Sequence, residues 1–119
     1  MPKLLQIAQL GQAVLRKKAL KVINIPDEEL QHLVDDMLAT VEDNDGVGIA
    51  APQVYESKRL LIVASKPNKR YPNAPSMKPV VMINPEILEL SGEKVKDWEG
   101  CLSIPGIRAL VPRFNKVKA

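Results

Sequence analysis

Residues 26–46 read PDEELQHLVDDMLATVEDNDG and predict the longest helix of the chain. Apolar residues recur in this stretch at steps of three and four, which places them along one face of an amphipathic helix. They are Leu30, Leu33, Val34, Met37, Leu38 and Val41. The acidic residues after Pro26 suit a helix N-terminus, because they face its unpaired N–H groups and the positive end of its dipole. We expect the helix to end where Asn44 or Gly46 adopts the left-handed conformation common at helix C-termini.

Short aliphatic runs after this helix predict strands. Residues 60–64 and 80–83 are aliphatic and contain β-branched side chains, and residues 107–111 form a third candidate that we expect Pro112 to end. Residues 66–79 contain four prolines. Such a stretch cannot form a regular strand ladder, so it predicts a long surface loop between two strands.

The order of the elements favours an α+β fold with mostly antiparallel sheets. Residues 87–90 and 93–98 flank Ser91-Gly92, which we expect to form a hairpin turn. Residues 4–20 are predicted to form an irregular arm before the helix. The length of 119 residues allows one domain, so we expect residues 1–119 to form a single domain.

Composition argues against several classes of protein. Seventeen basic and fourteen acidic residues give a net charge of +3, which is too mild to indicate a nucleic-acid partner. Aromatic residues make up only 3% of the chain, too few for a platform that stacks single-stranded bases. No apolar run approaches the ~20 residues that span a bilayer, and Cys101 is the only cysteine. We therefore expect a cytoplasmic protein without a membrane or nucleic-acid partner.

The segment GVGIAAPQ, residues 46–53, is the first that suggests chemistry. Two glycines around one residue allow backbone conformations or close approaches that a Cβ atom would prevent. Taken alone, the segment favours a tight turn between helix and strand. A dinucleotide site is the wrong inference, because these glycines follow a helix rather than a strand.

The segment WEGCLSIPG, residues 98–106, contains the lone cysteine. An isolated cysteine in a reducing compartment is more often an inert buried side chain than a reactive one. Gly100, however, leaves the approach to Cys101 open, and residues 104–106 are expected to turn the chain. Backbone N–H groups in such an irregular stretch can point at a ligand. The residues themselves leave both interpretations open.

Together the two segments resemble the peptide deformylases, which remove the formyl group from N-formylmethionine at new protein N-termini. Residues 46–53 match the family motif Gly-x-Gly-x-Ala-Ala-x-Gln, and residues 99–103 match Glu-Gly-Cys-Leu-Ser. Both occur in the family's order and at about its spacing, behind the expected helix. The resemblance runs along essentially all 119 residues.

The resemblance implies a divalent metal bound by one cysteine and two histidines, Fe²⁺ in the cell and often Ni²⁺, Co²⁺ or Zn²⁺ in purified protein. It implies that Cys101 is the thiolate ligand. The side-chain amide of Gln53 and the backbone N–H of Leu102 would hold the oxyanion that forms on the formyl group. The backbone of Gly48 would pair with the substrate peptide, and Val47 would help to wall the pocket for the methionine side chain.

The family's third motif, His-Glu-x-x-His, does not occur in this sequence, so the remaining metal ligands are absent from this chain. His32 is its only histidine, and we expect it to be solvated because it lies off the apolar stripe. In the family the third-motif helix packs between the sheets. Its absence is expected to leave the strands at 60–64, 80–83 and 107–111 without their main cover. We therefore expect an incomplete deformylase, inactive alone, whose full-length form associates with the ribosome.

Two further expectations complete the sequence-based interpretation. Glu99 and Arg113 are expected to form an ion pair. The alternative to a deformylase is a non-catalytic, deformylase-like module that binds peptides through the walls formed by the two motifs. A cysteine-nucleophile amidase is disfavoured, because the chain supplies no base to activate the thiol apart from His32.

Overall fold

The computed structural model describes residues 2–119. Along the chain the elements are the 3-10 helix η1 (Ala13–Leu15), the helix α1 (Glu28–Asp43), strand β1 (Gly48–Ala50), the 3-10 helix η2 (Ala51–Val54), and strands β2 (Leu60–Val63), β3 (Val80–Ile83), β4 (Glu89–Leu90), β5 (Lys94–Cys101), β6 (Ile104–Phe114) and β7 (Val117–Lys118). All strand pairings between these elements are antiparallel. The predicted α+β class is confirmed.

Helix α1 forms where the apolar spacing predicts it. Asp27 caps its N-terminus, because the side-chain carboxylate accepts the backbone N–H of Glu29 at 3.0 Å. The apolar stripe faces inward, and Met37 is fully buried at 0% exposure. His32 lies on the solvent-exposed side of the same helix, as expected.

The end of α1 differs from the prediction. Asp45, with φ 54°, adopts the left-handed conformation, whereas Asn44 has φ −96°. The Gly46 N–H then donates to the Val41 carbonyl at 2.9 Å, which closes the last turn. Gly46 is needed for space: a Cβ atom there would lie 2.8 Å from Val41 Cγ2.

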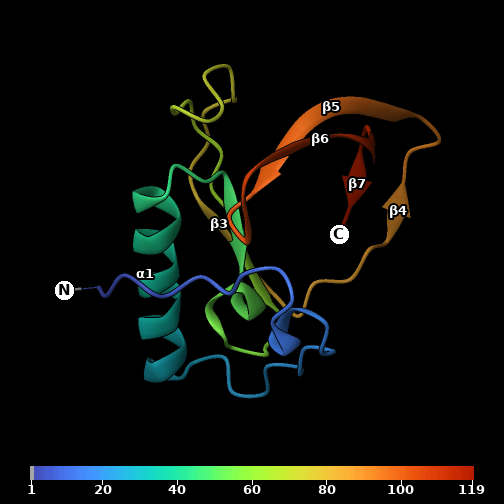
Figure 1. Cartoon of the computed structure of the whole chain (residues 1–119). Helices are drawn as coiled ribbons and strands as arrows, with labels where there is room; N and C mark the ends of the chain where they lie inside the picture. Colours follow the sequence, from blue (N-terminus) through green and yellow to red (C-terminus); the bar gives the residue numbers. More distant parts are fainter. Residues whose placement is uncertain (1) are drawn as a thin grey trace.

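The core lies between α1 and a three-stranded sheet with the order β1-β2-β3 (Figure 1). Leu60 and Ile62 of β2 are 2% and 1% exposed, and Ile49 of β1 joins them against the helix. The strand predictions at 60–64 and 80–83 are confirmed to within one residue. This packing fixes β1, and with it the loop that carries the first motif.

Strands β5 and β6 form a long curved hairpin beside the sheet, and β4 pairs with β7 (Figure 1). The predicted hairpin turn at Ser91-Gly92 is wrong, because β4 and β5 belong to different pairs. The hairpin turn is at Leu102-Ser103, inside the second motif. The turn expected at residues 104–106 falls on the start of β6, where residues 105–107 have no partner in β5 and Gly106 has φ 77°. Pro112 does not end its strand either.

Pro112 is tolerated inside β6 because of its register. Asn115 donates to the Glu93 carbonyl, so hydrogen-bonded pairs of this ladder fall on odd-numbered residues of β5. Pro112 opposes Lys96, a non-hydrogen-bonded pair. The missing N–H of the proline therefore points away from β5 and removes no ladder hydrogen bond.

Many apolar side chains beyond the core are exposed. Val80 on β3 is 46% exposed, and Trp98, Ile107 and Leu110 on the hairpin are 58%, 62% and 50% exposed. The expectation of uncovered strands is confirmed for β3 and β6 and is wrong for Leu60 and Ile62 of β2, which α1 covers. Within residues 2–119, no helix has the length and apolarity needed to cross a membrane.

Candidate active site

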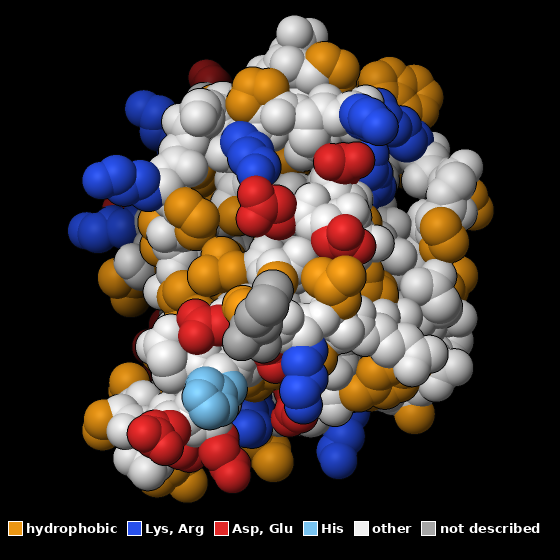
Figure 2. Space-filling model, turned by 90° about the vertical axis from the view of Figure 1, so that its left-hand side faces the viewer, with side chains coloured by type: hydrophobic (Ala, Val, Ile, Leu, Met, Phe, Trp, Pro, Cys, Tyr) orange, Lys and Arg blue, Asp and Glu red, His pale blue; other side chains and the backbone are white. Residues whose placement is uncertain are grey.

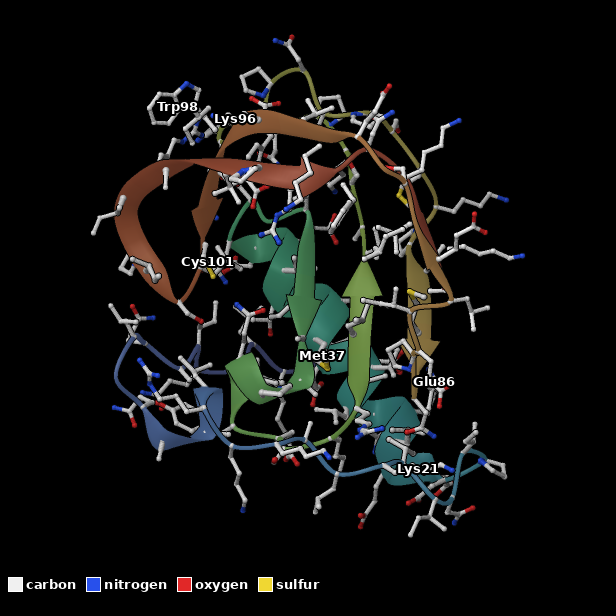
Figure 3. The ribbon with its side chains drawn as sticks, turned by 90° about the vertical axis from the view of Figure 1, so that its right-hand side faces the viewer. Lys21, Met37, Glu86, Lys96, Trp98 and Cys101 are labelled. Carbon is white, nitrogen blue, oxygen red and sulfur yellow. The ribbon has the colours of Figure 1, made fainter. Side chains whose placement is uncertain are left out.

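The two sequence motifs meet where η2 lies against the turn of the β5–β6 hairpin. The side-chain amide nitrogen of Gln53, Nε2, lies 3.6 Å from Cys101 Sγ and 3.2 Å from Ser103 Oγ. Cys101 is an exposed free thiol at the end of β5 (Figure 3). The structure therefore brings together two residues that are 48 positions apart in the sequence.

The orientation of the Gln53 amide follows from its other hydrogen bond. Its oxygen, Oε1, accepts the backbone N–H of Ala50 at 3.0 Å. A carbonyl oxygen accepts and cannot donate, so this bond assigns the NH₂ end of the amide to the side that faces Cys101. Gln53 thus presents a donor where a developing negative charge could be held.

The N-terminal arm ties the two motifs together. The Ala8 N–H donates to the Gln53 carbonyl at 2.6 Å, and the Leu10 N–H donates to the Ser103 carbonyl at 2.8 Å. Ala8 is fully buried and Ser103 is 4% exposed. The irregular arm that the sequence predicts therefore has a structural task, which is to hold η2 and the hairpin turn side by side.

Leu102 occupies the hairpin turn itself. Its carbonyl accepts a hydrogen bond from the Gln9 side chain at 3.4 Å, and its side chain packs at Gly46, where an added Cβ would lie 3.2 Å from Leu102 Cδ1. Among residues 2–119, the Leu102 N–H has no acceptor. The site thus has two candidate donors: the Gln53 amide, which lies 3.6 Å from Cys101 Sγ, and the N–H of Leu102, the residue after Cys101.

The backbone of Gly48 faces the open edge of the sheet. The Ala64 N–H donates to the Val47 carbonyl at 2.8 Å, so Val47 and Ala64 form a hydrogen-bonded pair of the β1–β2 ladder. The next pair, Gly48 and Val63, is then non-hydrogen-bonded. Because β1 is an edge strand, the N–H and C=O of Gly48 point outward, where an extended peptide could add as a further strand.

The expected ion pair between Glu99 and Arg113 is confirmed. Arg113 Nε lies 3.0 Å from Glu99 Oε2 and Nη2 lies 2.9 Å from Oε1, a bidentate arrangement across the β5–β6 hairpin. The hydrogen bond from Arg113 lowers the pKa of Glu99 below its ordinary value of 4.5, and the same contact raises the pKa of Arg113. The pair links β5 to β6 two residues before Cys101.

The described residues supply part of a metal site only. Cys101 fits the role of a thiolate ligand, because it is exposed, carries a soft donor and has a hydrogen-bond donor beside it. Residues 2–119 hold no group of three or more His, Cys, Asp or Glu side chains able to bind a metal together. His32 and Cys101 do not belong to a common group of metal-binding side chains within residues 2–119. His32 lies beside Lys3, Asp35 and Asp36 on the helix side of the molecule (Figure 2).

The family model for polypeptide deformylase matches residues 4–119. The chain belongs to the polypeptide deformylase family. It is 58% identical over 117 residues to peptide deformylase 2 of Nostoc sp., covering 98% of this chain and 65% of the relative. It is 46% identical to peptide deformylase 2 of Shewanella oneidensis, covering 93% of this chain and 61% of that protein. The chain thus spans less than two thirds of the length of these curated relatives.

Solved deformylase structures share the fold. A class I type b peptide deformylase from Acinetobacter baumannii, bound to Met-Ala-Ser, matches with a TM-score of 0.94 and 50% identity over 98% of this chain and 75% of that chain. Peptide deformylase from Thermotoga maritima matches with a TM-score of 0.82 and 37% identity, over 96% of this chain and 70% of that chain. The deformylase fold assignment is therefore established for these residues.

Two residues at the site escaped the sequence analysis. Ser103 accepts the second hydrogen bond of the Gln53 amide, and Tyr71, in the proline-rich loop, reaches the backbone of Gly100. Ser103 lay within a recognised motif but carried no assigned role. Tyr71 gave one usable signal: it is an aromatic residue, a type that makes up only 3% of this chain, in a loop otherwise rich in proline and polar residues.

Proposed function

We propose that the protein to which this chain belongs removes the formyl group from N-formylmethionyl peptides by metal-dependent hydrolysis. The observation that carries this proposal is the Gln53 amide, held by Ala50 with its NH₂ toward the Cys101 thiol. Membership of the deformylase family supports it. So does the Met-Ala-Ser peptide bound by the relative from Acinetobacter baumannii, because that peptide is a deformylated product by its chemistry.

Each site residue has a task in this proposal. Cys101 is one ligand of a divalent metal, Fe²⁺ or alternatively Ni²⁺, Co²⁺ or Zn²⁺, and the other ligands come from outside residues 2–119. When bound, the metal polarises the formyl carbonyl and makes an activated water available near neutral pH. Gln53 Nε2 and the Leu102 N–H hold the negative charge that develops on the formyl oxygen.

The first strand positions the substrate. The outward N–H and C=O of Gly48 hydrogen bond to the peptide backbone in the manner of an added strand, and Val47 lines the pocket for the methionine side chain. Strand β1 leads directly into η2, which contains Gln53. A peptide paired with the β1 edge therefore extends toward Gln53. Main-chain pairing accepts any sequence after the methionine, as nascent chains require.

Turnover of formyl-Met-Ala-Ser by the full-length gene product tests the proposal. We expect deformylation that depends on added divalent metal and is abolished in Cys101→Ser, while acetyl-Met-Ala-Ser is not cleaved. Ser76→Ala is the matched control, because it removes the hydroxyl group of an exposed serine in the loop between β2 and β3 and leaves the thiol and Gln53 untouched. Full activity in Cys101→Ser would remove Cys101 from the metal site. Residues 1–119 alone are expected to be inactive, and activity with bound metal in that preparation would refute this.

A peptide-binding module without hydrolysis is the second candidate. It is favoured by one observation, the open β1 edge, which needs no metal to bind a peptide. Binding of formyl-Met-Ala-Ser without turnover by the metal-loaded full-length protein would support it. For the hydrolase, action on nascent chains implies a cytoplasmic location and association of the full-length form with the ribosome.

A further inference from the structure

Ser103 is a buried polar residue in the turn that follows Cys101. Within residues 2–119, only Thr40 and Ser103 are polar and buried, at 0% and 4% exposure. A hydroxyl group that leaves water costs free energy unless it forms a hydrogen bond. In the described part of the chain, the only hydrogen-bond partner of Ser103 Oγ is Gln53 Nε2, at 3.2 Å. The burial of this hydroxyl is therefore matched by a group of the candidate active site.

The hydroxyl of Thr40 shows what a purely structural contact looks like in this fold. It accepts the backbone N–H of Leu5 at 2.9 Å and donates to the backbone carbonyl of Asp36 at 2.6 Å. Both partners are main-chain groups, and the contact attaches the N-terminal arm to α1. Ser103 differs because its hydroxyl meets a side chain that has a proposed role in the reaction.

Three contacts determine the orientation of the Gln53 amide. Oε1 accepts the Ala50 N–H at 3.0 Å, while Nε2 donates one hydrogen to Ser103 Oγ at 3.2 Å and faces Cys101 Sγ at 3.6 Å with the other. A thiol sulfur is a weak acceptor, whereas a hydroxyl oxygen has two lone pairs. Ser103 is therefore the stronger of the two acceptors for this NH₂ group.

The NH₂ group needs this second fixed point. The terminal torsion of a glutamine side chain has a broad energy profile, so a single hydrogen bond at Oε1 leaves the amide plane free to turn. Stabilisation of a developing charge depends on donors that already have the correct orientation. With one hydrogen held by Ser103 Oγ, the other hydrogen of Gln53 Nε2 is directed toward Cys101.

The N-terminal arm holds the backbones of the two residues at a fixed separation. The Ala8 N–H donates to the Gln53 carbonyl at 2.6 Å, and the Leu10 N–H donates to the Ser103 carbonyl at 2.8 Å. These main-chain bonds bring η2 to the hairpin turn, but they do not determine where the Gln53 amide points. The hydrogen bond between the two side chains determines that direction.

We propose that Ser103 is a positioning residue: its hydroxyl takes one hydrogen of the Gln53 amide and thereby directs the other at the formyl oxygen. The contribution to catalysis rests on the function proposed above, whereas the effect on the Gln53 amide does not. A Ser103 hydroxyl that served only the packing of the turn would stabilise the fold without acting through Gln53.

A double-mutant cycle in the metal-loaded full-length gene product tests the proposal. Ser103→Ala removes the hydroxyl in the wild-type background and in a Gln53→Ala background. Thr40→Val is the matched control, because it removes the other buried hydroxyl and leaves Gln53 and Cys101 untouched. The values of kcat and KM for formyl-Met-Ala-Ser are measured for each variant, together with bound metal and urea unfolding.

Ser103→Ala should lower kcat by about three- to tenfold, the effect of one ordinary hydrogen bond, with KM and bound metal unchanged. In the Gln53→Ala background it should lower kcat no further. Thr40→Val should leave kcat unchanged, even where it destabilises the fold as much as Ser103→Ala does. An unchanged kcat in Ser103→Ala, an equal fall in both backgrounds, a loss of bound metal, or an equal fall in Thr40→Val would overturn the proposal.

A measurement without turnover separates this proposal from the proposed function. The order parameter of the Gln53 side-chain NH₂ group, from ¹⁵N relaxation of the full-length protein, should fall in Ser103→Ala from about 0.85 toward ~0.6 and stay unchanged in Thr40→Val. An unchanged value in Ser103→Ala would exclude the positioning role of Ser103. Absence of deformylation by the wild type would refute the proposed function, and the order parameter would still decide whether Ser103 orients Gln53.

Discussion

Replacing Gln53 by glutamate separates the catalytic use of this side chain from its structural use. A carboxylate keeps an oxygen that can accept the Ala50 N–H, now met at 3.0 Å by Gln53 Oε1, but it has no N–H to offer at Nε2. The substitution therefore removes a donor from the site and leaves the local turn in place. Gln53→Ala, in contrast, removes both ends of the amide.

The expected magnitudes differ accordingly. Loss of one oxyanion donor lowers kcat by about 10²–10³-fold, or roughly 2.7–4 kcal/mol of transition-state stabilisation. Both variants should show this loss. Gln53→Ala should also lower the free energy of unfolding by about 1–3 kcal/mol, because its two neutral hydrogen bonds, to Ala50 and Ser103, contribute ~0.5–1.5 kcal/mol each.

Steady-state deformylation of formyl-Met-Ala-Ser at saturating metal, with urea unfolding in parallel, checks both numbers in the full-length protein. Gln31→Ala is the matched control, since Gln31 is an exposed glutamine of α1 whose side chain bonds to Asp35 at 3.0 Å and not to the site. Its kcat should stay within twofold of the wild type. A Gln53→Glu variant whose kcat remains within tenfold of the wild type would refute the assignment of Gln53 as an oxyanion donor.

Three further predictions address the core, the ion pair and the substrate edge. Met37→Ala, at a fully buried site, should lower the free energy of unfolding by about 2–5 kcal/mol in urea, and half-buried Leu33→Ala by less; equal losses would contradict the packing described for α1. The pKa of Glu99 is lowered in the folded state, so its pairing with Arg113 stabilises the fold above pH 4.5 and is lost as the pH falls below that value. Arg113 is 68% exposed and Glu99 33%, so solvent screening should limit the effect to ~0.2–1 kcal/mol. Acid unfolding curves of wild type and Glu99→Gln that stay parallel as the pH falls through 4.5 would exclude it. Gly48→Ala keeps the main-chain N–H and C=O, but its Cβ would lie 3.0 Å from the Ile62 carbonyl oxygen, so β1 must shift. The shift should weaken one to two main-chain hydrogen bonds to the peptide and raise KM for formyl-Met-Ala-Ser by about tenfold, with little change in kcat; a selective fall in kcat would argue against strand addition at β1.

The helix was predictable because its signal is local. The three- and four-residue spacing of apolar side chains determines which face of α1 is buried, whatever packs against it. The end of the helix was not predicted correctly. Asn44 or Gly46 was expected to adopt the left-handed conformation, and Asp45 adopts it instead. Gly46 is required there for lack of space beside Val41, and not for its conformation.

The strand pairing depended on partners that no local signal reveals. Ser91-Gly92 has the composition of a hairpin turn, yet Glu89 pairs with Lys118 near the end of the described chain. The real turn uses Leu102-Ser103, which carries no glycine or asparagine. In the sequence, Pro112 predicts the end of a strand. In the structure it takes a position whose N–H is not needed by the β5–β6 ladder, and that position is set by the register of the whole hairpin.

For the site, the motifs identified Cys101 and Gln53, but their contact is a product of the fold. The N-terminal arm, through Ala8 and Leu10, brings η2 and the hairpin together, and its sequence gave no sign of that role. The contact of Tyr71 with the Gly100 backbone was also not predictable, because a contact between a loop side chain and a distant strand leaves no periodic pattern in the sequence. The extent of the domain over residues 1–119 stays a prediction.

The central claim is that Cys101 is a metal ligand in a hydrolytic site, and X-ray absorption of the metal-loaded full-length protein tests it most directly. The account predicts one sulfur scatterer at about 2.3 Å from the metal in the wild type and none in Cys101→Ser. A wild-type spectrum fitted by nitrogen and oxygen ligands alone, in a protein that still deformylates formyl-Met-Ala-Ser, would contradict it.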